Sequence, residues 1–243
     1  MRRTIKTSRT TAKKAAAKSA PPALTETVPT ATRRRPVAAK AAPTATMTIR
    51  APAQRRLVIG ITGASGVVYG LRLLEWLKNS SIEAHLVLTR AAEMTIAYET
   101  PYAIKDVKAL AAKTYPISDI GAAISSGSFQ TLGMVVMPCS MKTLAEIATG
   151  VTSNLLTRAA DVTLKERRRL VLVPRETPLH LGHLRNMTAV TEMGAIVAPP
   201  MPAFYAQPES LDDLVNHTVG RVLDLFGIET TLVKRWSGKP LKP

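Results

Sequence analysis

Residues 57–66 read Leu-Val-Ile-Gly-Ile-Thr-Gly-Ala-Ser-Gly, and this stretch decides the fold. Its β-branched first half predicts a short buried strand, and its glycine-rich second half predicts a tight loop. Leu71, Leu74 and Leu77 follow at the spacing of one helix face. A strand that passes through glycines into a helix is typical of the opening unit of a parallel α/β sheet.

The alternation of strand and helix continues toward the C-terminus. Further apolar, strand-sized runs lie at 85–89, 133–138, 170–174 and 195–198. Helical patterns lie at 91–98, from Ser140 onward, and at 155–168, 179–193 and 211–226, whereas 99–130 is mixed in character. Because such alternation requires right-handed crossovers, it predicts one doubly wound α/β domain. A parallel sheet between two helical layers makes this a Rossmann/flavodoxin-like three-layer fold.

The composition excludes several classes of protein. No apolar run approaches the roughly 20 residues of a membrane-spanning helix, so we expect no membrane insertion. The 243-residue chain has one cysteine, Cys139, which excludes an internally disulfide-bonded scaffold. A cysteine-based zinc or iron–sulfur site within one chain is excluded as well. A single thiol also suits a reducing compartment.

Most of the net charge of +16 belongs to residues 1–54. This segment holds twelve of the 33 basic residues, one of the 17 acidic residues and no aromatic residue. Such a composition cannot bury enough apolar surface to fold, so we predict a disordered basic extension before a folded domain at 55–243. The extension fits a targeting peptide, a tail that binds nucleic acid or anionic surfaces, or a dispensable addition. Because the rest is only mildly basic, nucleic-acid binding is disfavoured.

Ligands of doubly wound sheets bind beyond the carboxyl ends of the strands. At this edge of the sheet, the loop 63–66 leads into the start of a predicted helix. The backbone N–H groups and the helix dipole at such a start favour an anion. A simple tight turn is the alternative interpretation of this loop. A second loop, Pro138–Thr143, places hydroxyl groups and a cation at another helix start, where Ser140 would equally serve as a helix cap. Both loops suit a flavin, whose ring edge and phosphate need hydrogen-bond donors.

A nicotinamide dinucleotide is disfavoured as the ligand. None of the five tyrosines has a lysine four residues later, which short-chain reductases would require. The second predicted strand ends in Thr89-Arg90, where a dinucleotide site would have an acidic residue for the adenosine ribose. FMN has no adenosine and needs no such acid.

Charged residues flank the strand at 170–174. Arg158 and Lys165 lie two helical turns apart on one face, and a surface ion pair between Asp161 and Lys165 is the alternative interpretation. Arg175-Glu176 follows the strand directly, and a charge pair placed there is more often a site than a solvated face.

Two histidines, His180 and His183, have the i,i+3 spacing of a chelating pair. No cysteine or second acidic cluster completes the ligand set, and Glu176 is the only near carboxylate. Histidines that pack a helix are therefore favoured over a metal site.

Seven motifs together resemble the flavin prenyltransferases of the UbiX type. They are Thr-Gly-Ala-Ser-Gly (62–66), Ala-Tyr-Glu-Thr (97–100), Pro-Cys-Ser (138–140), Arg-Ala-Ala-Asp-Val (158–162), Leu-Lys-Glu-Arg-Arg (164–168), Val-Pro-Arg-Glu (173–176) and Ala-Phe-Tyr (203–205). The match runs in order from about Leu57 to Trp236, and the Lys-Glu-Arg-Arg and Pro-Arg-Glu segments are its most specific parts.

The resemblance implies an enzyme that joins a dimethylallyl group from dimethylallyl phosphate to N5 and C6 of reduced FMN. No metal is implied, and the prenylated FMN would serve a UbiD-type decarboxylase, commonly in ubiquinone biosynthesis. Members of the family are typically homo-dodecamers whose site is shared between subunits. The implied compartment is the cytoplasm, or the mitochondrial matrix if the basic extension is a targeting peptide.

The resemblance also implies roles for individual residues. FMN would contact Gly63, Ala64, Ser65, Thr89, Ser140, Met141, Lys142, Thr143 and Arg158. Dimethylallyl phosphate would contact Lys165, Arg175, Tyr205 and Arg221, because cations must meet the phosphate charge where no metal does. Catalysis would use Glu176 first and then Glu99 for proton transfer, together with Ser65 near flavin N5 and Lys165. Aromatic faces, Tyr205 and Trp236, would stabilise an allylic cation. Residues 125–132 lack the tryptophan that some relatives have in the prenyl pocket.

Two alternatives remain from the residues alone. One is an FMN-dependent decarboxylase of aromatic acids or of peptidyl-cysteine; the cysteine enzymes lack the Lys-Glu-Arg-Arg and Pro-Arg-Glu set. The other is a flavin-storing or nucleic-acid-associated binding protein that uses the basic extension and would lose salt-dependent binding without residues 1–54.

Overall fold

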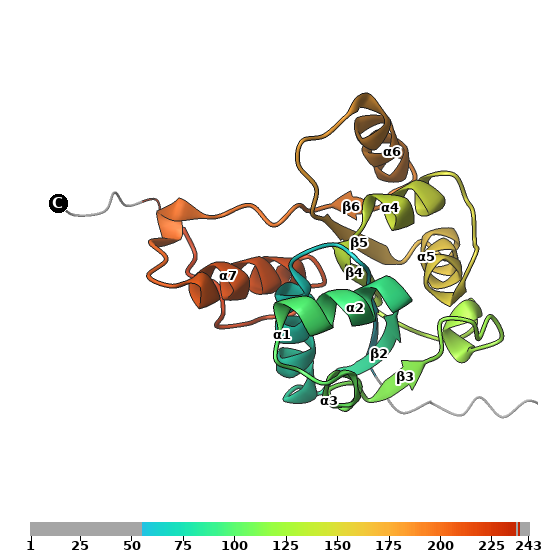
Figure 1. Ribbon diagram of the computed structural model, residues 1–243, viewed down its shortest axis with the longest axis horizontal. Coiled ribbons are helices and arrows are strands. Elements are labelled where there is room, and N and C mark those ends of the chain that lie inside the picture. The colour runs from blue at the N-terminus through green and yellow to red at the C-terminus, as the bar shows by residue number, and fades with distance from the viewer. Residues whose placement is uncertain (1–54, 237, 239–243) are drawn as a thin grey trace, which may run out of the picture. The chain divides into compact units, whose positions relative to one another are not determined.

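The computed structural model describes residues 55–236 and residue 238. The predicted disordered extension at 1–54 lies outside these residues. Within them, six strands form one sheet in the order β3-β2-β1-β4-β5-β6, and every pair is parallel (Figure 1). The strands are β1 (Arg56–Ile61), β2 (Glu83–Leu88), β3 (Lys113–Tyr115), β4 (Gly133–Cys139), β5 (Arg169–Pro174) and β6 (Ile196–Val197).

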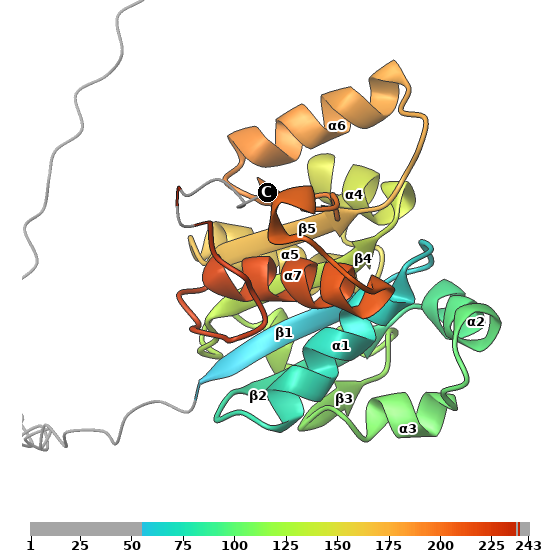
Figure 2. The same ribbon diagram turned by 90° about the vertical axis from the view of Figure 1, so that its left-hand side faces the viewer.

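Helices cover both faces of the sheet, as the alternation of elements predicted (Figures 1 and 2). They are α1 (Val67–Lys78), α2 (Arg90–Glu99), α3 (Ile104–Lys108), α4 (Met141–Ala148), α5 (Leu155–Lys165), α6 (Leu181–Glu192) and α7 (Leu211–Asp224), with short 3-10 turns at Ala123–Ser125 and Phe204–Ala206. Two separate buried clusters result, one with side chains from α1, α2, α3 and α7 and the other with side chains from α4, α5 and α6. The predicted doubly wound three-layer fold is confirmed.

The strand sequences explain this layering. Along β1, Leu57, Ile59 and Ile61 belong to one buried cluster, whereas Val58 belongs to the other. All seven residues of β4 are buried, as expected of a central parallel strand that is covered on both faces. A Cβ atom at Gly70 would lie 2.3 Å from the Met137 carbonyl oxygen, so this glycine lets α1 approach β4 closely.

The mixed stretch at 99–130 contains α3 and β3, which the sequence patterns did not predict. Both elements are short, with five and three residues. Each buries one side chain, Val107 in α3 and Tyr115 in β3, so neither repeats an apolar position often enough to show a period.

The strand order changes direction between β1 and β4. Connections from β1 lead outward through β2 to β3, whereas those from β4 lead the opposite way through β5 to β6. In doubly wound sheets the crevice at the carboxyl ends of such a strand pair is the usual ligand site. Among the described residues, no helix has the length and apolar character that crossing a membrane would need.

Candidate active site

Thr62 links the carboxyl ends of β1 and β4. It is 1% exposed, and its hydroxyl donates to the Pro138 carbonyl oxygen at 2.8 Å. The same hydroxyl oxygen accepts a hydrogen bond from the Ser140 N–H at 2.7 Å, and the Thr62 N–H donates to Pro138 at 3.2 Å. The two loops that the sequence singled out are therefore fixed side by side.

The glycine loop is completed by a carboxylate from α2. Gly66 has a left-handed backbone with φ of 92° and offers no side chain to cap α1. Instead, the N–H groups of Gly66 and Val67 donate to Glu99 Oε2 at 2.9 and 3.1 Å. The anion that the loop was predicted to favour is thus the protein's own Glu99 carboxylate.

Two more helix starts face the same edge of the sheet. Thr89 caps α2 by accepting from the Ala92 N–H at 3.0 Å, and Ser140 caps α4 by accepting from the Thr143 N–H at 3.3 Å. Within the described part of the chain, the following amide N–H groups have no hydrogen-bond acceptor: Arg90, Ala91, Met141 and Lys142. A Cβ atom at Gly63 would lie 2.3 Å from the Ala91 Cβ, so only glycine lets the β1 loop come this close to α2.

The lysine of the second loop points elsewhere. The Lys142 side chain is exposed, and its Nζ lies 3.3 Å from Glu146 Oε1, one turn along α4. The Lys142 ammonium group, the cation predicted for this helix start, therefore belongs to a surface ion pair. The hydroxyl and amide groups of the loop remain at the helix start.

Arg175 connects the end of β5 to the glycine loop. Its Nε donates to the Ser65 carbonyl oxygen at 3.3 Å. The exposed Glu176 accepts a hydrogen bond from the Thr177 N–H at 3.0 Å, and no ion pair joins it to Arg175 among the described residues.

These residues define one region, which we call the carboxyl-edge cradle. It comprises residues 62–66, 89–91, Glu99, 140–143, Arg175 and Glu176. Unused amide donors at two helix starts suit a phosphate, and the loop carbonyl and hydroxyl groups between them suit a polar ring edge. The cradle therefore has the donor set that FMN requires.

Arg158 and Lys165 lie near opposite edges of the sheet. α5 starts where the Leu155 N–H donates to the Ile117 carbonyl oxygen at 2.9 Å, just beyond β3, and Arg158 lies in its first turn. Lys165 ends α5, and its Nζ lies against Gly127, which precedes β4. A seven-residue strand spans roughly 20 Å, which separates Lys165 from the cradle of its own chain.

The alternative pairing of Asp161 with Lys165 is wrong. Asp161 Oδ2 lies 2.6 Å from Arg158 Nη1 instead, and Lys165 pairs with Glu166. Asp161 lies three residues from Arg158 and four from Lys165, and both spacings allow contact on a helix.

Tyr205 and Arg221 belong to a further region that we call the α7 cluster: Tyr205, His217, Arg221 and Trp236. The Tyr205 hydroxyl and His217 Nε2 are 3.0 Å apart, and the Tyr205 and Trp236 ring centroids are 5.9 Å apart at an angle of 81°. Just beyond the last residue of α7, the Leu225 carbonyl oxygen accepts a hydrogen bond from the Arg169 guanidinium, so this end of the helix lies beside the first residue of β5. Arg221 therefore lies toward the amino edge, whereas Arg175 follows the other end of β5.

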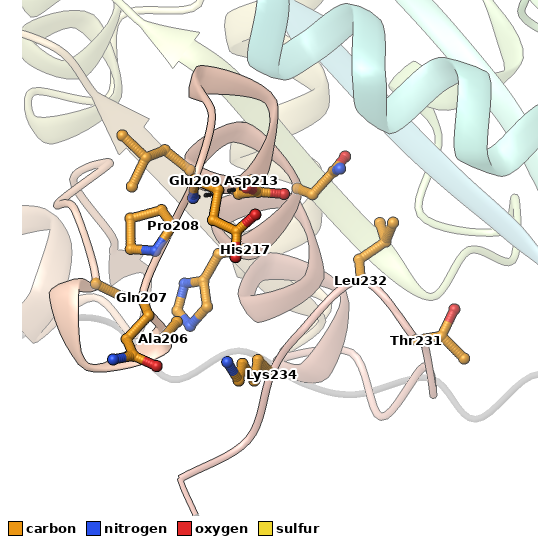
Figure 3. A pocket seen from close by; sticks show the side chains of 12 residues that line it. Ala206, Gln207, Pro208, Glu209, Asp213, His217, Thr231, Leu232 and Lys234 are labelled. Atoms are coloured by element: carbon orange, nitrogen blue, oxygen red, sulfur yellow. Dashed lines mark hydrogen bonds between the residues drawn. The ribbon is translucent and has the colours of Figure 1, made fainter. Parts of the chain in front are cut away.

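Two cavities of the described structure have His217 in their walls. One, of about 390 Å³, lies between the 206–209 segment, α7 and the C-terminal segment, and Figure 3 shows the imidazole projecting into it near Ala206 and Lys234. The other, of about 300 Å³, has mostly apolar walls that include Met201 and Val222, with Arg221 among its few polar groups.

A hub at Arg72 joins α1 to α7 and to the segment after α2. The Arg72 guanidinium lies 3.1 Å from Glu75 Oε2 and 2.8 Å from Asp212 Oδ1, and it also donates to Asn216. The Tyr102 hydroxyl donates to Glu75 Oε1 at 2.5 Å. Because Tyr102 is three residues from Glu99, this hub connects the cradle side of α1 with the helix of the α7 cluster.

Burial shifts the pKa of two groups near these regions. It raises the pKa of the Cys139 thiol to about 12, so this residue stays protonated beside the cradle and is no nucleophile. Burial, and next the positive charge of Arg221, lower the pKa of His217, so its imidazole is neutral at pH 7.

The first histidine of the predicted pair is a helix cap. His180 caps α6 by accepting from the N–H groups of Gly182 and His183 at 3.0 and 3.4 Å. Across residues 55–236 and 238, no group of three His, Cys, Asp or Glu side chains is arranged to hold a metal ion.

One chain brings together most of the predicted FMN-binding residues, whereas the predicted donor-binding residues lie in three places: Lys165, Arg175, and Tyr205 with Arg221. Sequence reasoning missed Thr62, Arg72 and His217. A threonine that directly precedes the glycine loop was the one available signal for Thr62, whereas Arg72 and His217 sit in ordinary helical patterns.

Comparisons with known proteins decide the family. The Flavoprotein family model matches residues 48–223. "Flavin prenyltransferase UbiX" of Escherichia coli (strain K12) is 58% identical over 187 residues, 76% of this chain and 99% of the relative. The chain belongs to the UbiX flavin prenyltransferase family. "Flavin prenyltransferase PAD1, mitochondrial" of Saccharomyces cerevisiae is 54% identical over 187 residues and covers 77% of both chains.

Solved structures agree with this family membership. The crystal structure of AnUbiX in complex with FMN and dimethylallyl pyrophosphate has a TM-score of 0.76 and 51% identity, covering 77% of this chain and all of that one. A dodecameric FMN-dependent UbiX-like decarboxylase from Escherichia coli O157:H7 has a TM-score of 0.74 and 53% identity, covering 75% of this chain and all of that one. The cysteine decarboxylase TvaF, at 21% identity and a TM-score of 0.50, shares the fold alone.

Proposed function

We propose that the protein transfers a dimethylallyl group to reduced FMN. The C1–O bond of the phosphorylated donor breaks and a carbon bond forms at flavin N5, whose proton leaves with the inorganic phosphate. Ring closure at C6 then adds one proton to the prenyl double bond and releases the C6 proton, so the flavin gains C5H8 in total. The observation that carries this proposal is the cradle: three helix starts converge on a glycine loop in a chain 58% identical to a flavin prenyltransferase.

FMN would bind in the carboxyl-edge cradle. The unpaired amides at the starts of α2 and α4 provide donors for its phosphate, with Thr89 and Ser140 holding those turns in place. Residues 63–65 would lie along the ring, and the contact of Arg175 with the Ser65 carbonyl oxygen would keep that loop closed. The reduced flavin supplies the electron-rich nitrogen and carbon that accept the prenyl group.

The donor phosphate is negatively charged, and cationic side chains can stabilise it as it leaves. We assign its binding to Lys165, Arg175 and Arg221, with the Tyr205 hydroxyl as a further hydrogen-bond donor. One chain places Lys165 and Arg221 toward the amino edge and Arg175 at the carboxyl edge. The complete site therefore needs more than one copy of the chain, and we propose a homo-oligomer, a dodecamer as for the Escherichia coli O157:H7 relative.

Proton transfer is best assigned to Glu176. Glu99 Oε2 already accepts two backbone hydrogen bonds, which makes it a constituent of the loop. Glu176 is exposed at the cradle, forms no ion pair with any described residue and accepts a hydrogen bond from the Thr177 N–H. A carboxyl group in this position can exchange protons with the departing phosphate or with the flavin ring.

The product, prenylated FMN, would be consumed by a UbiD-type decarboxylase, in ubiquinone biosynthesis. We place the protein in the cytoplasm, with the mitochondrial matrix as the alternative in which residues 1–54 act as a targeting peptide. The mitochondrial yeast relative supports that alternative.

The decisive test is anaerobic incubation of the protein with reduced FMN and a prenyl donor. We expect a flavin heavier than FMN by one C5H8 unit, with a changed absorbance spectrum. Dimethylallyl phosphate and dimethylallyl diphosphate, as separate substrates, identify the donor. Recovery of unmodified FMN with both donors, together with release of carbon dioxide from an aromatic acid or a peptidyl-cysteine, would replace this function by a decarboxylase.

A further inference from the structure

His217 is a buried histidine that no step of the proposed reaction uses. It lies on α7, is 9% exposed and has its Nε2 3.0 Å from the Tyr205 hydroxyl. The two rings meet edge to face, with centroids 5.6 Å apart at an angle of 82°. The imidazole thus holds the end of the Tyr205 ring that bears the hydroxyl group.

The surroundings of His217 favour a neutral ring with a defined role. Arg221 lies one turn further along α7, and the cavity wall opposite carries Lys234. Of the carboxylates nearby, Asp213 caps α7 and Asp224 pairs with Arg221 and Arg235, whereas Glu209 lines the same cavity as His217. Burial and the Arg221 charge lower the pKa of His217, so the ring forms this bond as a neutral imidazole.

The direction of this hydrogen bond decides what Tyr205 can do. If the Tyr205 O–H donates to Nε2, the phenol oxygen presents only acceptors to a ligand. If Nε2–H donates to the phenol oxygen, the Tyr205 O–H is released and can donate to a phosphate oxygen. A phosphate has only acceptors at its deprotonated oxygens, so it selects the second arrangement.

We propose that His217 is a positioning residue that donates from Nε2 to the Tyr205 oxygen and turns the Tyr205 O–H toward the donor phosphate. This proposal rests on the proposed function, because it assigns Tyr205 to the prenyl donor. Trp236 also packs against the Tyr205 ring edge to face, with the ring centroids 5.9 Å apart, and His217 controls the hydroxyl.

The test measures donor binding without turnover. Dimethylallyl phosphate is titrated by calorimetry into full-length protein loaded with oxidised FMN, which cannot accept the prenyl group. His217→Leu removes the hydrogen-bond partner, His217→Gln keeps an amide donor, and Tyr205→Phe removes the hydroxyl. Thr218→Val is the matched control on the same helix, because the Thr218 hydroxyl donates to the Leu214 carbonyl oxygen and does not contact Tyr205.

We expect His217→Leu to weaken donor binding about tenfold, a loss in the range of one charge-assisted hydrogen bond. His217→Gln should restore most of the affinity, and Thr218→Val should match the wild type. In the Tyr205→Phe background, His217→Leu should have no further effect, because the hydroxyl that His217 positions is gone. FMN retention and the melting temperature, measured for every variant, separate these effects from misfolding.

The possible failures are distinguishable. The positioning role would be overturned, while the prenyl transfer stands, if His217→Leu bound the donor as tightly as the wild type. The same conclusion would follow if His217→Leu lost as much donor affinity in the Tyr205→Phe background as in the wild type. Donor binding with the predicted pattern but without flavin modification would overturn the proposed reaction and leave the positioning role intact. Wild-type protein that does not bind the donor would overturn both.

Discussion

The carboxyl-edge cradle and the α7 cluster differ in how completely one chain builds them. In the cradle, Thr62, Glu99 and Arg175 tie loops from β1, α2, β4 and β5 together through hydrogen bonds between residues 32 to 110 positions apart in sequence. Among the described residues of the α7 cluster, the one polar contact joins Tyr205 and His217, which are 12 positions apart, and Trp236 is 62% exposed. One chain thus completes the region that we propose for the flavin and leaves the region that we propose for the prenyl donor incomplete.

This difference indicates a division of labour. A flavin with a ring and a phosphate needs donors fixed in space, which the ends of parallel strands provide. A small phosphorylated donor must enter and leave, and cations from flexible side chains can meet it where copies of the chain adjoin. The following variants test each half of this comparison, beginning with the largest expected effect.

Ser65→Asp should abolish FMN retention. A carboxylate in the glycine loop would repel the flavin and compete for its backbone donors. The measurement is bound flavin after desalting. Ser81→Asp, which introduces the same charge on an exposed turn after α1, should retain FMN. Flavin retention by Ser65→Asp at the wild-type level would place the flavin outside the cradle.

Glu176→Gln should slow prenyl transfer by about 10²–10⁴-fold, the usual contribution of a general acid–base group, with FMN affinity nearly unchanged. Glutamine keeps the size of the side chain but cannot exchange the proton. Single-turnover spectra at full flavin occupancy measure the rate, and Glu192→Gln, at the exposed end of α6, is the control. An unchanged rate would leave Glu99 as the remaining acid to test.

Thr62→Val should destabilise the protein by about 2 kcal/mol, because the buried Ser140 N–H would lose its acceptor. Denaturant unfolding of the FMN-free protein measures this change. Thr188→Val on α6, where the hydroxyl bonds to the exposed Leu184 carbonyl, should change stability by less than about 0.5 kcal/mol. Equal stabilities of the two variants would mean that Thr62 does not tie β1 to β4.

Removal of residues 1–46 should have the smallest effect. The segment has no aromatic residue and only four Leu, Ile or Val residues, so a chain of residues 47–243 should match the full-length chain in specific activity and melting temperature. A large loss in either quantity would show that the extension contributes to the cradle or to the α7 cluster.

The sequence predicted the parts of this molecule that depend on near neighbours. The β1 run, the glycine loop and the leucines of α1 specify a strand, a turn and a helix locally, and the alternation of such units implies the sheet. The caps at Thr89 and Ser140 also follow from residues within one turn. This is why the predicted fold agrees with the structure.

The remainder depends on contacts that no local pattern encodes. Glu99 caps a helix 32 residues earlier, and Thr62 bonds to a carbonyl 76 residues later, so both roles appear only once the strand order is known. The position of Lys165 is instructive in a different way. A helix that returns to the start of the next strand must end at the amino edge, so the topology alone separates Lys165 from the cradle.

The most direct test of this account is complementation between two inactive variants. Ser65→Asp lacks a working cradle, and Lys165→Ala lacks a donor-binding cation, and each alone should be inactive in flavin prenylation. Subunits exchanged at equal amounts should regain about a quarter of the wild-type activity, because a cradle from one variant can meet Lys165 of the other in a shared oligomeric site. Hybrids that contain both variants and remain inactive would contradict the account, since Ser65 and Lys165 would then have to serve a site within one chain.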